Sequence, residues 1–521
     1  MILVNNIKFP LHVKSEAEHI ARELKIPAND ILSAQLYRRS LDCRHKNDIH
    51  YTCSYVLTLK NESCYLEKLK NAKPYEKPVF SFPKTECDSR PIVIGFGPAG
   101  MFCAYILAKM GQKPIVFERG CDVDTRTAAA EHFMATGEWS DRGNIQFGEG
   151  GAGTFSDGKL NSGISDGYSR FVLETFVECG ADADILTDAK PHVGTDVLRT
   201  VVKNLRNKII SLGGEINFET TLVGFDVTGG RVNSVTVKNN TGEKTLPADK
   251  LILAIGHSAR DTFRMLKSLN IPMEQKPFAI GARIEHSQQK IDRTRYGGTK
   301  GLPPADYHLS VQLKNGRGAF SFCMCPGGVV VDARSDSEHI VTNGMSYKNR
   351  DGKNANSALL IGVSPEDFNS DDVLGGMYLQ EKIESAACSA GGGHPVSQTV
   401  GDFLNGVPST KFGTVSPSVR PFATPGDICA VLPDFITDSM REALPLLDKK
   451  LPGFSDGDAV LTAPETRSSS PVRILRGENR QSTVSGLFPC GEGAGYAGGI
   501  LSAAVDGIYT ALAAAKFSKQ G

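Results

Sequence analysis

Apolar and polar positions alternate with different periods along the chain, and the changes of period divide it into segments. Between residues 15 and 24 the apolar positions recur at helical spacing, which predicts a helix with Ser15 as its N-cap. Strands are predicted at 7–13 and 51–59. The stretch 73–88 contains three prolines and no periodic pattern, which is typical of a linker.

Beyond this linker the pattern is strand, glycine-rich turn, helix and strand. The apolar run 92–94 predicts a buried strand, a helix follows from Met101 to Met110, and a second strand is expected at 114–117. From Gly214 the apolar residues alternate at period two around two turns, which predicts a β-meander ending in a buried strand at 251–255. Farther on, strands mix with helices expected near 372–389 and 436–449.

The turn after the first buried strand reads Gly95-Phe96-Gly97-Pro98-Ala99-Gly100, which is GxGxxG. In a dinucleotide-binding fold the first glycine permits the tight turn, the second admits the pyrophosphate, and the third lets helix and strand pack closely. Glu118 ends the second strand, 18 residues after Gly100, where a carboxylate is expected to accept both hydroxyl protons of an adenosine ribose. The predicted contacts of this segment are Gly95, Gly97, Pro98, Ala99, Gly100, Glu118 and Arg119.

Two later segments favour FAD over NAD as the dinucleotide. The stretch "GLFPCGEGAGYAGGILSAAVDGIYTA" resembles the C-terminal FAD signature of two-domain flavoproteins, in which an acidic residue holds the ribityl chain and a helix points its positive end at the flavin. The stretch "DKLILAIGHSAR" resembles the strand and turn that return to FAD after the meander, and Val223 is the expected neighbour of the adenine. The predicted contacts here are Val223, Ala254, Gly256, Gly491, Glu492, Gly498, Gly499 and Ile500.

Further motifs make the whole chain similar to one bacterial family. They are "QFGEGGAGTFSDGKLNSG", "AIGHSARDTF", "CPGGVVV", "NGMSYKNRDGKNANSALLIGV" and "SSSPVRI". The chain resembles the FAD-dependent dehydrogenases, also called NAD(P)/FAD-dependent oxidoreductases, of the glutathione reductase and p-hydroxybenzoate hydroxylase-like superfamily. The resemblance implies non-covalent FAD and an extra α/β module before the nucleotide fold. One departure is Glu492, which stands where the superfamily commonly has Asp.

The predicted fold class is therefore α/β. We expect a small N-terminal α/β domain (1–72), the linker (73–88), a Rossmann-like FAD-binding domain with a β-meander (89–275 and 480–521) and an inserted mixed α/β substrate domain (276–479). No second nucleotide unit lies between Glu118 and Gly491, so NADH or NADPH, as electron donor or acceptor, would dock transiently in the substrate cleft.

The expected activity is hydride transfer between a small organic substrate and FAD. In the loop "FGEGGAGTFSDGKLNSG", Gly151, Gly153 and Ser156 are expected beside the cofactor. The predicted catalytic residues are His257 as a proton donor, with Asp157 and Lys159 bonded to the ring or the substrate.

Several residues keep a structural alternative. His257 is equally able to satisfy a backbone carbonyl, and the loop could be an ordinary polar turn. Small-residue packing is favoured over redox activity for the CxC pair Cys323 and Cys325. Polar side chains of the substrate domain could bind an acidic or amide substrate or could be structural; they are Arg283, Arg350, Asn354 and Asn356.

Composition narrows the remaining function classes. The 521 residues include 58 basic and 58 acidic ones, so no net field directs the chain to nucleic acid or an anionic membrane. The start of the chain lacks a signal-peptide core, and the apolar window near Asp506 suits an internal helix, so we expect a cytoplasmic protein with no membrane partner. The twelve cysteines show no metal-ligand spacing, and no metal is expected.

Two other functions stay open at this point. The basic stretch from Arg38 to Lys46 could serve a flavin-dependent RNA-modifying enzyme, although a solvated turn and edge strand is the favoured interpretation. The chain could also be an FAD-binding regulatory protein without catalysis.

Overall fold

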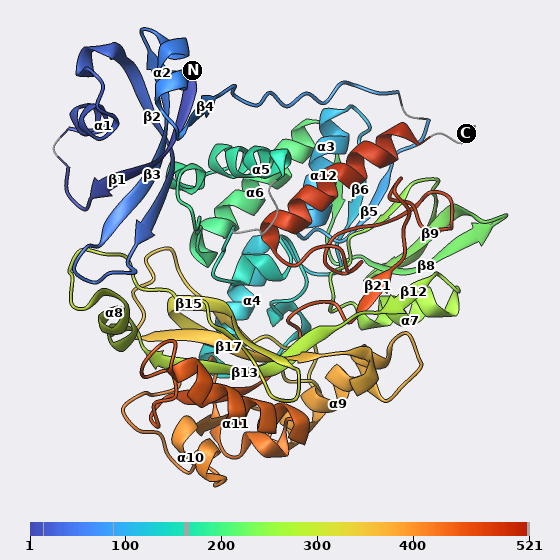
Figure 1. Cartoon of the computed structure of the whole chain (residues 1–521). Coiled ribbons are helices and arrows are strands. Elements are labelled where there is room, and N and C mark those ends of the chain that lie inside the picture. Colours follow the sequence, from blue (N-terminus) through green and yellow to red (C-terminus); the bar gives the residue numbers. More distant parts are fainter. Residues whose placement is uncertain (14, 87, 161–165, 518–521) are drawn as a thin grey trace.

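The computed structural model describes residues 1–13, 15–86, 88–160 and 166–517 (Figure 1). Its first part is an antiparallel sheet in the order β2-β3-β1-β4, with α1 and α2 packed beside it. The bounds are β1 Ile2–Pro10, α1 Glu16–Leu24, β2 Ile31–Asp42, β3 His50–Leu59, α2 Glu62–Lys68 and β4 Ala72–Pro74. Ser15 caps α1 by accepting the Glu18 N–H, which confirms the predicted N-cap, whereas β1 begins five residues earlier than expected.

A parallel sheet in the order β22-β11-β5-β6-β7 forms the centre of the next part. Its strands are β5 Ile92–Ile94, β6 Ile115–Phe117, β7 Glu215–Asn217, β11 Leu251–Leu253 and β22 Leu487–Pro489. Because alternate residues of a strand point to opposite faces, Val93 packs with the helices and Ile92 and Ile94 pack with the meander. The helices are α3 Pro98–Lys109, α5 Gly167–Glu178, α6 Thr195–Ser211 and α12 Ile500–Lys516; the meander is β8 Thr221–Thr228, β9 Arg231–Asn239 and β10 Gly242–Pro247.

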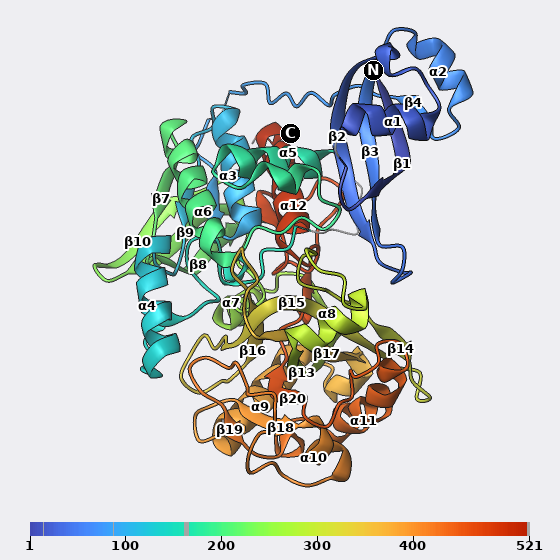
Figure 2. The same ribbon diagram turned by 90° about the vertical axis from the view of Figure 1, so that its left-hand side faces the viewer.

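A larger, mostly antiparallel sheet follows in the order β14-β15-β17-β13-β20-β18-β19, with β16 paired to β15. Figure 2 shows this sheet below the nucleotide-type fold, with α9, α10 and α11 on its far side. Its strands are β13 Phe278–Ser287, β14 Ser310–Gln312, β15 Gly318–Asp332, β16 Thr342–Met345, β17 Asn354–Val363, β18 Val396–Thr399, β19 Thr424–Pro425 and β20 Val460–Glu465. Its helices are α8 Gln288–Tyr296, α9 Gly375–Ala390, α10 Val400–Asn405 and α11 Asp434–Asp448.

Four further elements, two helices and two short strands, complete these parts. Helix α4 (Val123–Thr136) follows β6, and α7 (Arg260–Ser268) follows β11. Strand β12 (Met273–Gln275) pairs with β21 (Val472–Ile474), so the two chain crossings between the parallel sheet and the larger sheet run side by side. The mixed α/β fold class predicted from the sequence is thus present in the structure.

Helix α12 packs directly on α3 through small residues. A Cβ atom at Gly507 would lie 2.2 Å from the Ala99 carbonyl oxygen, so the helices approach to backbone contact. This helix contains most of the apolar window noted near Asp506, and no described helix is both long and apolar enough to span a bilayer. The contact fixes where the N-terminus of α12 lies relative to that of α3.

Glu384 on α9 ties the larger sheet to the parallel-sheet part. Its side chain is fully buried and binds Arg260 of α7 (2.9 Å) and Arg467 (2.7 Å). Burial alone would raise the pKa of Glu384, but Arg467 and Arg260 lower it to about 2. The carboxylate is therefore ionised in the folded protein at neutral pH and holds both guanidinium groups.

Adding a side chain at the helix contact should destabilise the protein. Gly507→Ala should lower the free energy of unfolding by about 1–3 kcal/mol, because the new Cβ separates α12 from α3. Gly167→Ala, at the exposed start of α5 with open space around its Cβ position, is the matched control and should cost nothing. Urea unfolding followed by circular dichroism checks both, and equal stability of the two variants would contradict the packing.

Removing the Glu384 carboxylate should destabilise the protein in a pH-dependent manner. Glu384→Gln should cost about 3–5 kcal/mol at pH 7, because it removes the buried carboxylate that the Arg260 and Arg467 guanidinium groups share. The folded-state pKa lies below the ordinary 4.5, so the carboxylate stabilises the fold above about pH 4.5 and this contribution is lost as pH falls toward 2. Urea unfolding of both proteins at pH 7 and pH 3.5 should show the difference shrinking; a constant difference would refute the electrostatic origin.

Candidate functional site

A cavity of about 340 Å³ lies at the carboxyl ends of the parallel strands and reaches the larger sheet. Ligands of open α/β folds bind at this edge, outside the carboxyl ends of the strands. Most of the residues predicted from the sequence line it together. They are Gly95, Gly97, Pro98, Ala99, Glu118, Arg119, Gly151, Gly153, Ser156, Asp157, Lys159, Ala254, Gly256, His257, Glu492, Gly498, Gly499 and Ile500.

Val223 does not line the cavity, and its expected place beside the adenine stays a prediction. Its side chain is 39% exposed, and Leu222, 4% exposed, lines the cavity instead. The reason is the two-residue period of β8, since neighbouring side chains face opposite sides of the meander.

Gly100 and Gly491 do not line the cavity either. They shape it indirectly, through close backbone contacts with neighbouring segments. A Cβ at Gly100 would lie 2.0 Å from the Gly95 carbonyl oxygen, which agrees with the close helix–strand contact expected there. Gly491 has a left-handed backbone (φ 75°), and its N–H donates to Asp506 at 2.7 Å. Asp506 also pairs with Arg476 and Arg480, so this buried carboxylate anchors the turn that carries Glu492. No sequence motif had indicated this role for Asp506.

Two helix N-termini open on the cavity. Gly97 is the N-cap of α3 and Gly499 that of α12, so neither helix start carries a capping side chain. A Cβ at Gly97 would meet Gly151 at 3.7 Å, and Cβ atoms at Gly256 and Gly498 would meet nothing within 4 Å. The glycines therefore leave a cradle beside unpaired N–H groups, which is the environment that a pyrophosphate requires.

Backbone N–H groups already hold the Glu118 carboxylate. Oε2 accepts the Phe96 N–H at 2.7 Å, and Oε1 accepts those of Gly120 and Gly148 at 2.9 Å. Since each carboxylate oxygen has two lone pairs, Oε2 retains one for a further donor. The carboxylate thus braces the glycine turn and has capacity for one ribose hydroxyl, not the two expected from the sequence.

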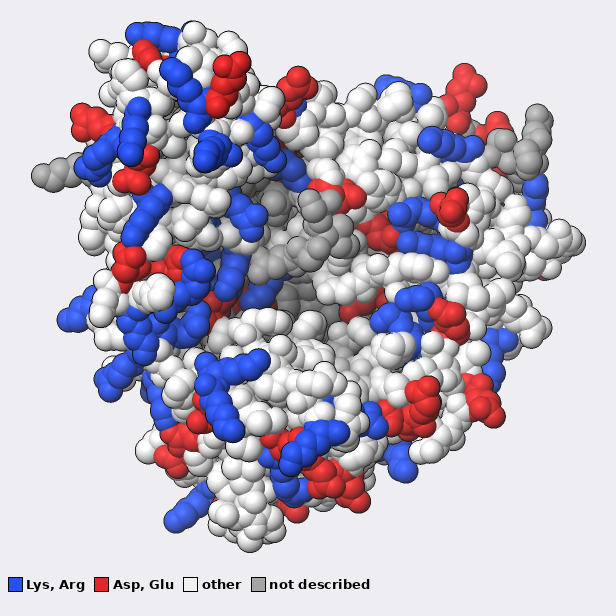
Figure 3. Space-filling view, viewed as in Figure 1, with Lys and Arg blue, Asp and Glu red and all other residues white. Residues whose placement is uncertain are grey.

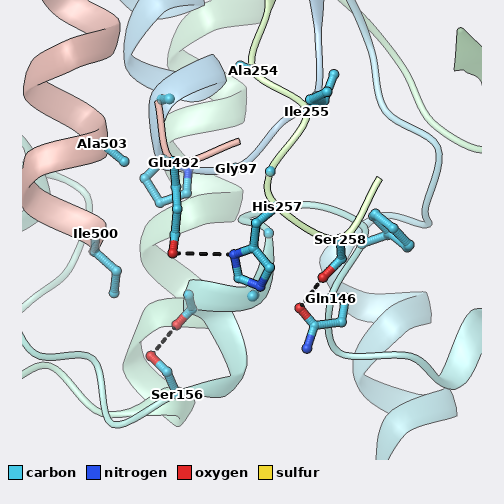
Figure 4. A pocket seen from close by; sticks show the side chains of 18 of the residues that line it. Gly97, Gln146, Ser156, Ala254, Ile255, His257, Ser258, Glu492, Ile500 and Ala503 are labelled. Atoms are coloured by element: carbon cyan, nitrogen blue, oxygen red, sulfur yellow. Dashed lines mark hydrogen bonds and ion pairs between the residues drawn. The ribbon is translucent and has the colours of Figure 1, made fainter. Parts of the chain in front are cut away.

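His257 and Glu492 face each other across the cavity (Figure 4). Their Nδ1 and Oε1 atoms are 3.3 Å apart. The Nε2 atom of His257 is buried and has no hydrogen-bond partner among the described residues. In the neutral ring, Nδ1–H toward Glu492 would leave Nε2 as the acceptor. Nearby, Ser258 donates to Gln146 and Ser156 to the Gly153 carbonyl (Figure 4).

Asp157 is the centre of a buried ionic cluster. Its carboxylate binds Lys159 at 2.8 Å and Arg350 at 2.6 Å and accepts the Ser346 hydroxyl, with His192 Nδ1 at 3.6 Å. Burial would raise the pKa of Asp157, but Lys159 and its other partners hold it well below its usual range. Burial would lower the pKa of Lys159, and Asp157 raises it above its usual value. Both groups are therefore charged.

The larger sheet supplies lining residues that the sequence had not assigned. They are Phe322, Cys323, Asn343, Glu465, Arg467 and Ser468. Arg467 directly precedes the quoted motif "SSSPVRI", and Ser468 begins it. This motif was the sequence signal that could have located both residues. Glu465 is buried against Arg283 (3.2 Å), and burial raises its pKa to about 7.

The other polar candidates divide between the site and the core. Arg350 joins the Asp157 cluster, whereas Asn354 binds Glu285 inside the sheet. Arg283 is fully buried and donates to Asn356 and to the Cys323 carbonyl. These contacts give Asn354 and Asn356 structural roles.

The basic stretch lies on edge strand β2 and the turn after it. Arg39 pairs with Asp188 at 2.8 Å, and Arg44 pairs with Asp42 at 2.5 Å. On the visible face of this part, blue and red side chains are interspersed (Figure 3). Its cations are thus partly neutralised within the protein, which weakens the RNA hypothesis.

Some expectations concern residues without a structural description. Residues 161–163 of the motif "FGEGGAGTFSDGKLNSG" and Cys87 lie outside the described residues. Within the described ranges, no group of three or more His, Cys, Asp or Glu residues is arranged to hold a metal ion.

Comparison with known proteins identifies two domains and a relative. Residues 277–468 match a family model described as "FAD-dependent protein, C-terminal domain-like", and residues 1–57 match a domain of unknown function. A protein of Clostridium beijerinckii, described as an uncharacterized protein, is 45% identical over 525 residues, which cover 98% of each chain.

Solved structures give weaker similarities. The flavin-dependent brominase Bmp2 aligns with a TM-score of 0.38 and 13% identity, over 82% of this chain and 79% of its own. A geranylgeranyl bacteriochlorophyll reductase-like protein of Thermoplasma acidophilum aligns with a TM-score of 0.35 and 13% identity, over 82% and 78%. These scores are too low to support a functional argument.

The family assignment therefore depends on the full-length relative and the matched domain. The chain belongs to the same family as the C. beijerinckii protein, and its residues 277–468 match the C-terminal domain of FAD-dependent proteins.

Proposed function

We propose that this protein is an oxidoreductase that binds FAD non-covalently in the cavity and transfers a hydride between FAD and a small organic substrate. One observation carries the proposal: the N-termini of α3 and α12 open on one cavity whose walls are bare of side chains at Gly97, Gly256 and Gly498. A dinucleotide with a charged middle and a redox-active end suits this arrangement.

The α3 end of the cavity suits the pyrophosphate and adenosine. The positive end of the helix favours the anion, and Oε2 of Glu118 has capacity for a ribose hydroxyl. The α12 end suits the flavin ring, because that helix's positive end stabilises the charge of reduced flavin. FAD would supply the two-electron chemistry there.

His257 is the proposed proton-transfer residue. Glu492 orients its ring through Nδ1 and leaves the buried Nε2 able to accept or donate a proton inside the cavity. Glu492 would then act as a positioning residue for His257, in addition to the ribityl contact expected from the sequence.

Lys159 is the proposed substrate-binding cation. An ammonium group has three N–H donors; one meets Asp157 and one meets the Met324 carbonyl, which leaves one for a ligand. Asp157 has its oxygens occupied by Arg350, Ser346 and Lys159, so we assign it the positioning of Lys159 and no proton transfer. A substrate with a carbonyl or carboxylate oxygen matches the remaining donor.

A nicotinamide nucleotide is the proposed partner in the second half-reaction. Within the described residues the parallel sheet provides one glycine-rich nucleotide turn, and the cavity continues from it to the larger sheet. NADH or NADPH would therefore bind transiently on the substrate side.

A side chain at Gly97 should abolish flavin binding without unfolding the protein. Its φ of −77° suits any residue and a Cβ would make only an ordinary contact with Gly151, so Gly97→Val should fold but block the pyrophosphate, lowering affinity by about tenfold or more. Gly224→Val on the meander, where the Cβ position is in open space, is the control and should stay yellow. Absorbance near about 450 nm measures bound flavin. A yellow, folded Gly97→Val protein would reject the pyrophosphate assignment.

Reduction by nicotinamide tests the activity itself. Anaerobic addition of NADH or NADPH to the purified protein should bleach the flavin band near about 450 nm, because a hydride passes to FAD. Dithionite reduction of the same sample is the control. A band that persists with both nucleotides but bleaches with dithionite would remove nicotinamide from the proposal and favour another donor.

A further inference from the structure

Two cysteines lie at the wall of the cavity. Cys323 is half-buried and lines the cavity beside Phe322, whereas Cys325 is fully buried behind it. Both belong to β15, the strand of the larger sheet that faces the nucleotide-type fold (Figure 1). A reactant in the cavity would therefore meet Cys323 first.

The backbone between them departs from a regular strand. Phe322 pairs with Ala358 and Cys325 with Asn356, so β15 has one more residue than β17 between these pairs and forms a bulge. Cys323 adopts φ 43°, a left-handed conformation that is strained for a residue with a Cβ. Such bulges re-aim side chains beside active sites.

Two bonds hold the bulge in place. Lys159 donates to the carbonyl of Met324, and Arg283 donates to that of Cys323 at 3.0 Å. Arg283 also lies 3.7 Å from the Cys325 sulfur. Each cation is fixed by a carboxylate, Asp157 and Glu465 respectively. The strain at Cys323 is thus maintained by ionic groups of which Lys159, Asp157 and Glu465 line the cavity and Arg283 lies buried behind it.

These groups make the two thiols unequal. The Cys325 thiol donates to the Cys323 carbonyl at 3.3 Å. Contact with the Cys325 thiol, together with Lys159 and Arg283, lowers the pKa of Cys323 below its usual value against the opposing effects of burial and Asp157. The same interaction with Cys323, together with burial, raises the pKa of Cys325 well above its usual value. A low-pKa accessible thiol beside a protonated second thiol is the pattern of redox-active cysteines.

We propose that Cys323 and Cys325 are a redox-active dithiol that exchanges an electron pair with the flavin in the adjoining cavity. This inference rests on the proposed function, since it takes FAD as the electron acceptor. In the oxidising direction the S–S bond forms and the Cys325 S–H bond breaks. Two electrons and that proton pass to oxidised flavin, which becomes the reduced flavin anion.

The spacing permits this bond. Residues two apart in an extended strand have Cα atoms about 6.6 Å apart, within the range of disulfides, and a bulge bends the strand further. The thiolate of Cys323 also has the protonation state required to form the bond, because the thiolate is the reactive species.

A reductive titration with dithionite tests whether Cys323 and Cys325 form a redox-active pair. The oxidised holoprotein should take up two dithionite equivalents per flavin, one for FAD and one for the disulfide, whereas Cys325→Ser should take up one. Cys388→Ser, at a half-buried cysteine on α9 outside the cavity lining, is the matched control and should take up two.

Thiol labelling of the wild-type protein gives a second readout that needs no variant. After air oxidation and denaturation, iodoacetamide should leave the peptide with Cys323 and Cys325 unlabelled, and dithionite treatment should add two labels, as mass spectrometry would show. If the flavin-bearing protein takes up one dithionite equivalent, and iodoacetamide labels both cysteines of the oxidised protein, the dithiol proposal is wrong while the proposed function stands. Protein that binds no flavin overturns the proposed function with it.

Discussion

The structure depends on contacts between backbone segments that tolerate no side chain. A Cβ at Gly95 would lie 2.2 Å from the Ala254 carbonyl oxygen, and one at Gly493 would lie 2.4 Å from that of Gly256. With Gly507 against Ala99, these contacts bring three segments remote in sequence to one edge of the parallel sheet. The cavity exists because glycine lets these segments approach while leaving space between them.

Ion pairs of buried carboxylates also fix the geometry of the cavity. Glu384, Asp157 and Asp506 are each surrounded by arginine or lysine side chains, and each binds groups from separate elements. Their hydrogen-bonding capacity is largely used within the protein. His257, Lys159 and Cys323 keep capacity toward the cavity, so the proposed function gives the chemistry to these groups and positioning to the three carboxylates.

The N-terminal sheet contacts both larger parts. Strand β2 extends through main-chain bonds between Arg39 and the segment 187–189, and Cys43 contacts Arg295 on α8. The domain thus packs against the nucleotide-type fold on one side and the larger sheet on the other (Figure 1). This placement gives a structural reason for a module ahead of the glycine turn.

The sequence by itself determined the local elements whose signals lie within a few residues. The cap at Ser15, the strand 92–94, the glycine turn and the meander depend on short-range propensity and periodicity, and they were predictable for that reason. The glycines of the cavity lining were predictable because a close approach of backbone segments requires the absence of a side chain. For the start of the meander the two-residue period did not state which face is buried, and Leu222, not Val223, is the buried residue.

Only the tertiary structure decided which distant residues meet. Three features depend on pairing between residues far apart in the sequence. Asp506 holds the Gly491 turn, Glu118 accepts three backbone N–H groups, and Cys323 faces the cavity. No local pattern encodes such pairings, because they arise from how the sheets pack and where a bulge turns a strand. The sequence thus specified the parts of the glycine-lined cavity, and packing specified which side chains are left with unused hydrogen-bonding capacity inside it.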